Sequence, residues 1–273
     1  MSPAPKIRFA CQTYSWQMSI EAYRGRIDHM IATTRKAGFA GFEPELIMLG
    51  DDWSPLRLSS DLAENGVSLA ALCLVETWSR TGETDAESDN ANRVIEAVAY
   101  NPGAVINLCQ FPGNDRVNLR ERQQNVLRCL DDVSRRADDA GVHCTFHPNS
   151  PVGSVFRTAN DYELLMNSLP ERIGFTPDLG HIAKGGMDPL EIVSTYRERV
   201  DHLHIKDIAA SGAWSPTGDG VIDIPAVVRY LVDTGYNGWI AMEDESPDAE
   251  RDPDSAVLRN GDYVRSVLGP VIS

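Results

Sequence analysis

The feature that most constrains the fold is a regular alternation between short apolar segments and longer amphipathic ones. Eight short segments have the length and composition of buried strands: Ile7–Tyr14, Gly38–Glu43, Val67–Val75, Ala104–Cys109, Val142–His147, Ile173–Asp178, Val200–Lys206 and Trp239–Glu243. Each is followed by a segment that reads as a helix, and glycine often marks the return to the next strand. Strands that alternate strictly with helices form parallel sheets joined by right-handed crossovers.

Eight strand–helix units predict a closed (β/α)8 barrel, a TIM barrel, with one domain over residues 1–273. An open doubly wound sheet is the alternative. No glycine-rich phosphate-binding fingerprint follows the first predicted strand, which favours the barrel.

The charge balance argues against nucleic acid as a partner. The chain carries 25 basic and 40 acidic residues, a net charge of −15, whereas a nucleic-acid-binding surface usually needs a basic stripe. No apolar run approaches the roughly 20 residues that a membrane span requires, and no apolar segment of a secretion signal is visible at the start. The five scattered cysteines form no CxxC pair, which fits a reducing compartment. We therefore expect a cytoplasmic protein without nucleic-acid or membrane partners.

Polar side chains gather at the predicted carboxyl ends of the strands, where TIM barrels build their active sites. Four of them, from strands five to eight, are metal-competent: His147, Asp178, His204 and Glu243. Because alternate residues of a strand share a face, His204 and Lys206 can both point into the barrel mouth. A buried carboxylate is costly unless it is paired or metal-bound. We expect one divalent metal ion on these four side chains, the alternative being ordinary hydrogen bonds at the rim.

Several motifs in this part of the chain are familiar as a set. They are Phe175–His181 (FTPDLGH), His202–Asp207 (HLHIKD), Gly218–Asp223 (GDGVID) and Gly235–Asp244 (GYNGWIAMED), preceded by Gly38–Glu43 (GFAGFE). With these motifs the chain resembles the xylose-isomerase-like TIM barrels over nearly its whole length. That superfamily includes ketose 3-epimerases, hydroxypyruvate isomerases, inosose dehydratases and endonuclease IV.

The resemblance implies that Asp178, His204 and Glu243 bind the metal and that strand five supplies a fourth ligand. Epimerases of this group place a glutamate on strand five, whereas this chain has His147. In those epimerases the carboxylates of strands five and eight exchange a substrate proton from two faces, so His147 removes the symmetric pair. Inosose dehydratases resemble this chain in carrying histidine-rich sequence there. The resemblance also implies that His181 contacts substrate oxygens near the metal.

Two imidazoles and two carboxylates make a mixed nitrogen and oxygen site. We expect Mn²⁺, with Mg²⁺, Co²⁺ and Zn²⁺ as alternatives. Such an ion would polarise a carbonyl and stabilise the enediolate formed by deprotonation of the neighbouring carbon. The candidate acids and bases are Glu243, Lys206, Glu43 and His147. A nearby cation should lower the pKa of Lys206.

Other strand ends supply candidates for substrate contacts. Trp16 and Trp78 follow strands one and three, and aromatic rings commonly line ligand pockets, although packing at the rim is an equal alternative. Glu76 and Asn107 lie near the ends of strands three and four. Arg157, after strand five, is a candidate for binding an anionic group.

Four functions fit these residues. The first is a metal-dependent isomerase or epimerase of a sugar or cyclitol. The second is a lyase of the inosose dehydratase type, or one that cleaves a keto-glycoside. The third is a metal-free binding subunit, and the fourth an apurinic-site endonuclease, which the net charge of −15 and too few placeable ligands oppose. By analogy with the superfamily, a homo-oligomer would be in keeping with any of the enzymes.

Overall fold

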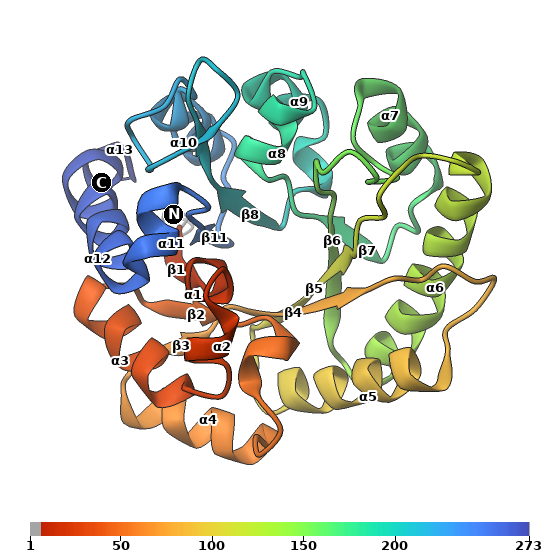
Figure 1. The fold of residues 1–273 in the computed structure, drawn as a ribbon, viewed down its shortest axis with the longest axis horizontal. Coiled ribbons are helices and arrows are strands. Elements are labelled where there is room, and N and C mark those ends of the chain that lie inside the picture. Colours follow the sequence, from red (N-terminus) through yellow and green to blue (C-terminus); the bar gives the residue numbers. More distant parts are fainter. Residues whose placement is uncertain (1–6, 273) are drawn as a thin grey trace.

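A ring of parallel strands forms the centre of the computed structural model, which describes residues 7–272 (Figure 1). In chain order the strands are β1 (Arg8–Gln12), β2 (Gly41–Glu43), β3 (Ser68–Leu69) with β4 (Ala71–Glu76), β5 (Val105–Gln110), β6 (His143–His147), β7 (Ile173–Phe175), β8 (His202–Ile205) and β11 (Trp239–Met242). The first and last strands pair in parallel, with Ala10 opposite Ala241. The predicted TIM-barrel fold is thus confirmed.

Two hydrogen-bonded sheets meet at both sides of this ring. One has the order β3-β2-β1-β11-β8 and the other β4-β5-β6-β7. β3 and β4 are one extended segment interrupted at Ala70. On the other side, isolated parallel bridges join Phe175 to Val200 and Asp178 to His204. The second bridge places Asp178 and His204 next to each other at the carboxyl ends of β7 and β8.

Helices surround the ring on its outer side (Figure 1). The main ones are α3 (Ile27–Ala37), α4 (Pro55–Glu64), α5 (Asp85–Ala99), α6 (Leu119–Asp139), α7 (Ala159–Ser168), α9 (Pro189–Thr195), α10 (Ile224–Asp233) and α12 (Pro253–Tyr263). α6 shows the expected amphipathic spacing, since Val126, Leu130, Val133 and Ala137 are all buried. Among the helices formed by residues 7–272, none has both the length and the hydropathy for crossing a bilayer.

Short elements that the apolar periodicity does not reveal lie in the connections. They are α1 (Tyr14–Gln17), α2 (Ile20–Tyr23), η1 (Leu46–Leu49), α8 (Leu179–Lys184), η2 (Arg197–Arg199), β9 (Asp207–Ile208), β10 (Trp214–Ser215), α11 (Pro247–Arg251), η3 (Val264–Leu268) and α13 (Gly269–Ile272). Residues 20–37 form two helices, α2 and α3, rather than one continuous helix. Gly25 adopts a left-handed φ of 80° there, which ends α2 before α3 begins.

Candidate metal centre

Four side chains from consecutive strand ends converge at the mouth of the barrel. One ligand atom each from His147, Asp178, His204 and Glu243 lies within 4.8 Å of the other three, and all four residues are buried. They lie at or just beyond the carboxyl ends of β6, β7, β8 and β11, so the parallel alignment of the strands brings them to one edge of the ring. These are the four side chains predicted to bind a metal, and the structure brings them together.

These four side chains, called the ligand group below, are not fully hydrogen-bonded within the described chain. Nε2 of His147 and Oδ2 of Asp178 are buried and have no hydrogen-bond partner there, although they lie 3.5 Å apart. The other oxygen of Asp178 accepts the backbone N–H of His181 at 2.7 Å, which fixes the carboxylate at the start of α8. An unsatisfied buried polar atom costs about 1–3 kcal/mol. Unpaired nitrogen and oxygen atoms converging on one point fit a divalent cation, and this group could bind one.

A second layer beneath the ligand group positions His204. Both oxygens of Glu43, which is fully buried at the end of β2, lie against polar hydrogens. Its neighbours are Nε2 of His204 and of His202, each at 2.7 Å, Nδ2 of Asn107 at 2.9 Å and the thiol of Cys73 at 3.0 Å. Glu43, His202, Asn107 and Cys73 are called the floor cluster below.

The floor cluster decides which nitrogen of His204 faces the ligand group. Because Nε2 faces Glu43, Nδ1 faces Glu243, 3.0 Å from its Oε2. A carboxylate behind a histidine fixes the ring and raises its basicity toward a metal. Burial would raise the pKa of Glu43, but His204 and His202 lower it well below its ordinary value. Glu43 is not among the residues that line the cleft described next, so its contacts fit a residue that positions His204, and its role as acid or base stays a prediction.

Lys206 lies beside the ligand group among three carboxylates. Its Nζ is 2.5 Å from Oε1 of Glu243 and 3.7 Å from Oδ2 of Asp178, and it also contacts Glu245. Burial lowers the pKa of Lys206, but these carboxylates raise it well above its ordinary value. The expectation that a bound cation lowers the pKa of Lys206 stays a prediction. Nζ also lies 3.0 Å from Nε2 of His181, so the ammonium group holds that imidazole in place.

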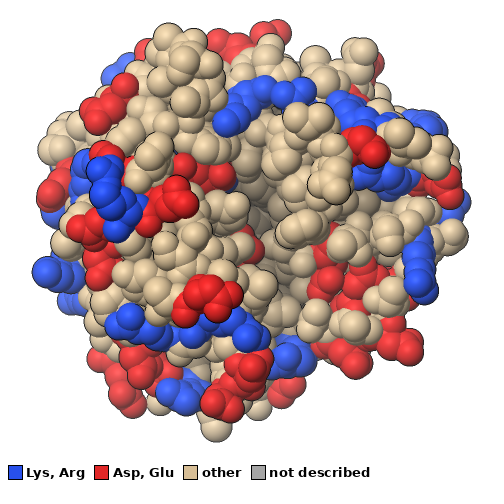
Figure 2. Space-filling model, in the orientation of Figure 1, with Lys and Arg blue, Asp and Glu red and all other residues tan. Residues whose placement is uncertain are grey.

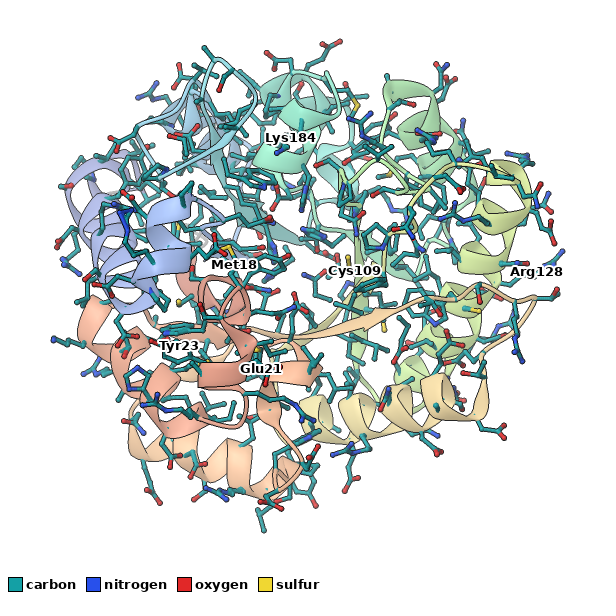
Figure 3. All side chains as sticks on the ribbon, in the orientation of Figure 1. Met18, Glu21, Tyr23, Cys109, Arg128 and Lys184 are labelled. Carbon is teal, nitrogen blue, oxygen red and sulfur yellow. The ribbon has the colours of Figure 1, made fainter. Side chains whose placement is uncertain are left out.

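A cleft of about 620 Å³ opens over the ligand group. Figure 2 shows the molecule hollowed near its centre, with acidic atoms visible at the wall of the hollow. Cys109, at the end of β5, is labelled near the centre of Figure 3 and lines the cleft. Other lining residues come from both sides of the mouth: Gln12, Tyr14, Gln17, Glu45, Trp53, Cys73, Glu76, Asn107, His147, His181, His204, Lys206, Glu243 and Glu245. Its size is typical of a small-molecule site.

A second hollow, of about 710 Å³, lies between α2, η1 and α4. Its lining includes Glu21, Asp51, Asp52 and Asp61. The groups of metal-competent side chains found within residues 7–272 lie at the barrel mouth and not here. The smaller cleft is therefore the candidate functional site.

Three of the predicted substrate contacts line the cleft. Nδ1 of His181 lies 2.8 Å from the Ser150 hydroxyl, so both ring nitrogens of this buried histidine are engaged. Glu76 accepts a hydrogen bond from Asn90 at 2.8 Å and stays half-buried. Asn107 is buried in the floor cluster and reaches the cleft from below.

The two predicted tryptophan contacts lie elsewhere, and the interpretation as rim packing is the better one. Trp16 is fully buried, and its indole N–H donates to Asp254 at 2.7 Å. Trp78 is also fully buried, and its backbone N–H donates to the Glu87 carboxylate at 2.8 Å. Each chain segment turns back into the protein just after its strand, which a strand-end rule cannot foresee.

Arg157 also lies outside the cleft. Its guanidinium group donates to the backbone carbonyls of Ser150 at 2.8 Å and Lys184 at 3.3 Å, so it ties the loop after β6 to the end of α8 rather than offering an anion site. Conversely, Tyr14 and Glu45 line the cleft, although neither is among the predicted site residues. The available signal for Glu45 was its position two residues after Glu43, in the loop that follows the strand.

The fold and the site define a TIM barrel with two histidines and two carboxylates gathered in its mouth. A family model described as xylose isomerase-like TIM barrel matches residues 31–265, and the chain belongs to that family.

Three relatives illustrate the likeness. The rhizopine catabolism protein MocC of Rhizobium meliloti is 30% identical over 164 residues, covering 53% of this chain and 48% of MocC. The inosose dehydratase of Geobacillus thermodenitrificans is 23% identical over 282 residues, covering 89% and 90%. The solved structure of the IOLI protein with a bound zinc atom has 16% identity and a TM-score of 0.72, covering 97% and 98%. The chain spans about half the length of the first curated relatives that it matches.

Proposed function

We propose that this protein is a metal-dependent enzyme that removes a proton from the carbon next to the carbonyl of a sugar or cyclitol ketone. The observation that carries the proposal is the convergence of unpaired His147 and Asp178 atoms with His204 and Glu243 inside a small-molecule cleft. A divalent cation bound there would polarise the carbonyl and stabilise the enediolate. Mn²⁺ is the first choice, and the zinc atom bound by the IOLI protein keeps Zn²⁺ as the alternative.

The chain's own residues orient the substrate beside the ligand group. The Lys206 ammonium group lines the cleft and can contact substrate oxygens, and the His181 imidazole, 3.0 Å away, can do so by exchanging one of its two present partners. Asp178 is held by the first turn of α8, and His204 is held by Glu43. Side chains fixed in advance need little reorganisation when charge develops on the substrate.

We favour the loss of water as the outcome of this deprotonation. Where an epimerase of this group would have a second carboxylate on the fifth barrel strand, β6 ends in His147. A symmetric exchange of one proton from two faces by the fifth and eighth strands is then not available. Elimination of a hydroxyl group from the next carbon does not need that symmetry. Inosose dehydratases are also among the curated relatives.

Isomerisation or epimerisation is the second candidate, and one observation favours it. Glu45 and Glu243 both line the cleft, from β2 and β11, so two carboxyl groups are available even though neither is on β6. A proton removed by one group could then be returned at another position. Both outcomes share the first deprotonation. We further propose that the enzyme is cytoplasmic and acts on small molecules.

The test is incubation of the Mn²⁺-loaded protein with ketoses and keto-inositols in D₂O, followed by NMR. Deuterium uptake with loss of water supports the dehydratase, and uptake with an intact or rearranged skeleton supports the isomerase or epimerase. The control is the same protein after chelation and dialysis, which should show neither. Absence of exchange across the whole panel would contradict the proposed chemistry, and failure to take up any metal would favour a binding subunit instead.

A further inference from the structure

Glu45 differs from the other buried carboxylates of the barrel mouth in its partners. Its side chain is almost fully buried, yet the contacts found within the described chain are amide groups. Nε2 of Gln17 donates to Oε2 at 2.8 Å, and Nε2 of Gln12 lies 3.4 Å from Oε1. Glu43 and Glu243, by contrast, each contact histidine or lysine. Glu45 therefore has hydrogen bonds that hold it in place but no direct ion pair within residues 7–272.

The position of Glu45 in the ring places it across the cleft from the ligand group. It follows β2, the second strand of the ring, whereas the ligand group comes from the fifth to the eighth strands. In a ring of eight, the second position is opposite the sixth, which carries Asp178. The Glu45 backbone is fixed by a hydrogen bond from its N–H to the Thr13 hydroxyl at 3.0 Å and by a bridge to Cys73. A substrate held at the ligand group would lie between the two sides.

The surroundings of Glu45 also suit proton transfer near neutral pH. Burial raises the pKa of Glu45 to about 7, with Gln17 lowering it and Glu243 raising it. A general base works best when its pKa is close to the operating pH. The amide donors keep the carboxylate oriented but leave its negative charge uncompensated. A lysine partner would neutralise that charge.

We propose that Glu45 is a catalytic residue, the base that accepts the proton from the carbon next to the substrate carbonyl. The inference rests on the proposed function. In the step, the C–H bond breaks and an O–H bond forms on Glu45. The C–H electron pair becomes the C=C bond, and the carbonyl π pair moves onto oxygen, so the negative charge passes from Glu45 to the enediolate. The proton on Glu45 then goes to the departing hydroxyl group or back to carbon.

The main test is Glu45→Gln, which keeps the size of the side chain and an acceptor for Gln17. In D₂O, exchange of the substrate's α-proton should fall by about 10²–10⁴-fold, the usual contribution of general base catalysis. Metal content and substrate affinity, measured by calorimetry, should change by no more than a few-fold. The matched control is Glu21→Gln on α2, an exposed carboxyl outside the cleft and labelled in Figure 3, which should exchange like the wild type.

A second variant separates a chemical role from a structural one. Gln17→Leu removes the amide that lowers the pKa of Glu45, so the acidic limb of the kcat/KM profile should move to higher pH. A purely structural role would lower the rate at all pH values without moving that limb. In the metal-free protein, NMR titration of labelled glutamate should show one signal with a pKa near 7 that is missing from Glu45→Gln.

The outcomes separate the two proposals. Normal α-proton exchange in both the wild type and Glu45→Gln overturns the role of Glu45 and leaves the proposed function standing. No exchange by the metal-loaded wild type overturns the proposed function and the base with it. Loss of exchange in Glu45→Gln together with retained metal and substrate binding supports both.

Discussion

The floor cluster and the ligand group are adjacent layers built from the same kinds of residue, but their carboxylates differ in what completes them. In the floor cluster, both oxygens of Glu43 lie within 3.0 Å of protein donors. In the ligand group, Oδ2 of Asp178 and Nε2 of His147 have no hydrogen-bond partner among the described residues. His204 belongs to both layers, with Nε2 toward Glu43 and Nδ1 toward Glu243.

The difference teaches that a buried carboxylate is not by itself evidence for a metal. Glu43 is as deeply buried as Asp178, yet the protein supplies its partners. Asp178 uses one oxygen to begin α8 and leaves the other directed at three neighbours that could share a cation. The floor cluster is thus complete within the protein, whereas the ligand group could hold a cation.

The largest expected effect comes from changing the free oxygen of Asp178. In Asp178→Asn, Oδ1 can still accept the His181 N–H and begin α8, while the unpaired oxygen becomes an uncharged amide. We expect metal affinity to fall by more than the roughly 100-fold typical of changes behind a ligand, as measured by metal analysis after dialysis. Circular dichroism should show the fold retained.

The matched control is Asp188→Asn at the start of α9. Asp188 accepts the Glu191 N–H at 2.8 Å in the same capping arrangement, but it is exposed and away from the mouth. It should leave metal content unchanged. Full metal stoichiometry in Asp178→Asn would show that the ligand group is not a metal site.

Adding a divalent metal should stabilise the folded protein through the ligand group. A ligand that binds only the folded state at 100 times its Kd contributes about 2.7 kcal/mol. For a chain of this size, that corresponds to a rise in Tm of roughly 5–10 °C, measurable by calorimetry with and without Mn²⁺. The reason is that the cation would offset the repulsion between the carboxylates of Asp178 and Glu243. It would also give a partner to Nε2 of His147 and Oδ2 of Asp178. Asp178→Asn should show no such rise, and an equal rise there would place the ion elsewhere.

The sequence predicted the ring because strand-like and helix-like segments alternate along it, and it predicted the ligand group because alternate residues of a strand share a face. His204 and Lys206 share a face of one extended segment, and the parallel order of the strands brings Asp178 and His147 beside them. The sequence could not separate the places of Glu43 and Glu45, because alternation gives a side chain's face but not its depth. Glu43 and Glu45 have the same parity, yet one lies in the floor cluster and the other in the cleft.

What lies beyond the strand ends was less predictable. Trp16 belongs to α1, four residues long, whose direction depends on packing against the C-terminal helices. Propensity alone does not specify so short a helix, because tertiary contacts provide most of its stability. α8 was missed for the same reason, although the Asp178 side chain that begins it was singled out as a ligand.

Changing Glu43 should weaken metal binding by the ligand group indirectly. Glu43→Gln leaves one acceptor oxygen for the two histidine nitrogens that now lie at 2.7 Å, so one imidazole loses its partner. We expect metal affinity to fall by about 10–100-fold, as for other residues behind a metal-binding histidine. The free energy of unfolding of the metal-free protein should fall by about 1–3 kcal/mol. Denaturant unfolding and metal titration measure the two effects separately.

A different pair of results would contradict the distinction between the floor cluster and the ligand group. If Glu43→Gln lost metal completely while the metal-free protein kept its stability, Glu43 would itself be a ligand, with His202 and His204 as its partners.

The smallest effect should come from Cys73, the weakest donor of the floor cluster. Cys73→Ala removes the thiol that lies 3.0 Å from Oε1 of Glu43, but the same oxygen keeps Nε2 of His204 and Nδ2 of Asn107. A hydrogen bond to a charged group contributes about 1.5–3 kcal/mol, but a thiol is a weak donor, so the free energy of unfolding should fall by only about 1 kcal/mol. Metal affinity should change by no more than a few-fold. A loss of metal affinity as large as that of Glu43→Gln would mean that Cys73 on β4, rather than the histidines of β8, holds Glu43 in position.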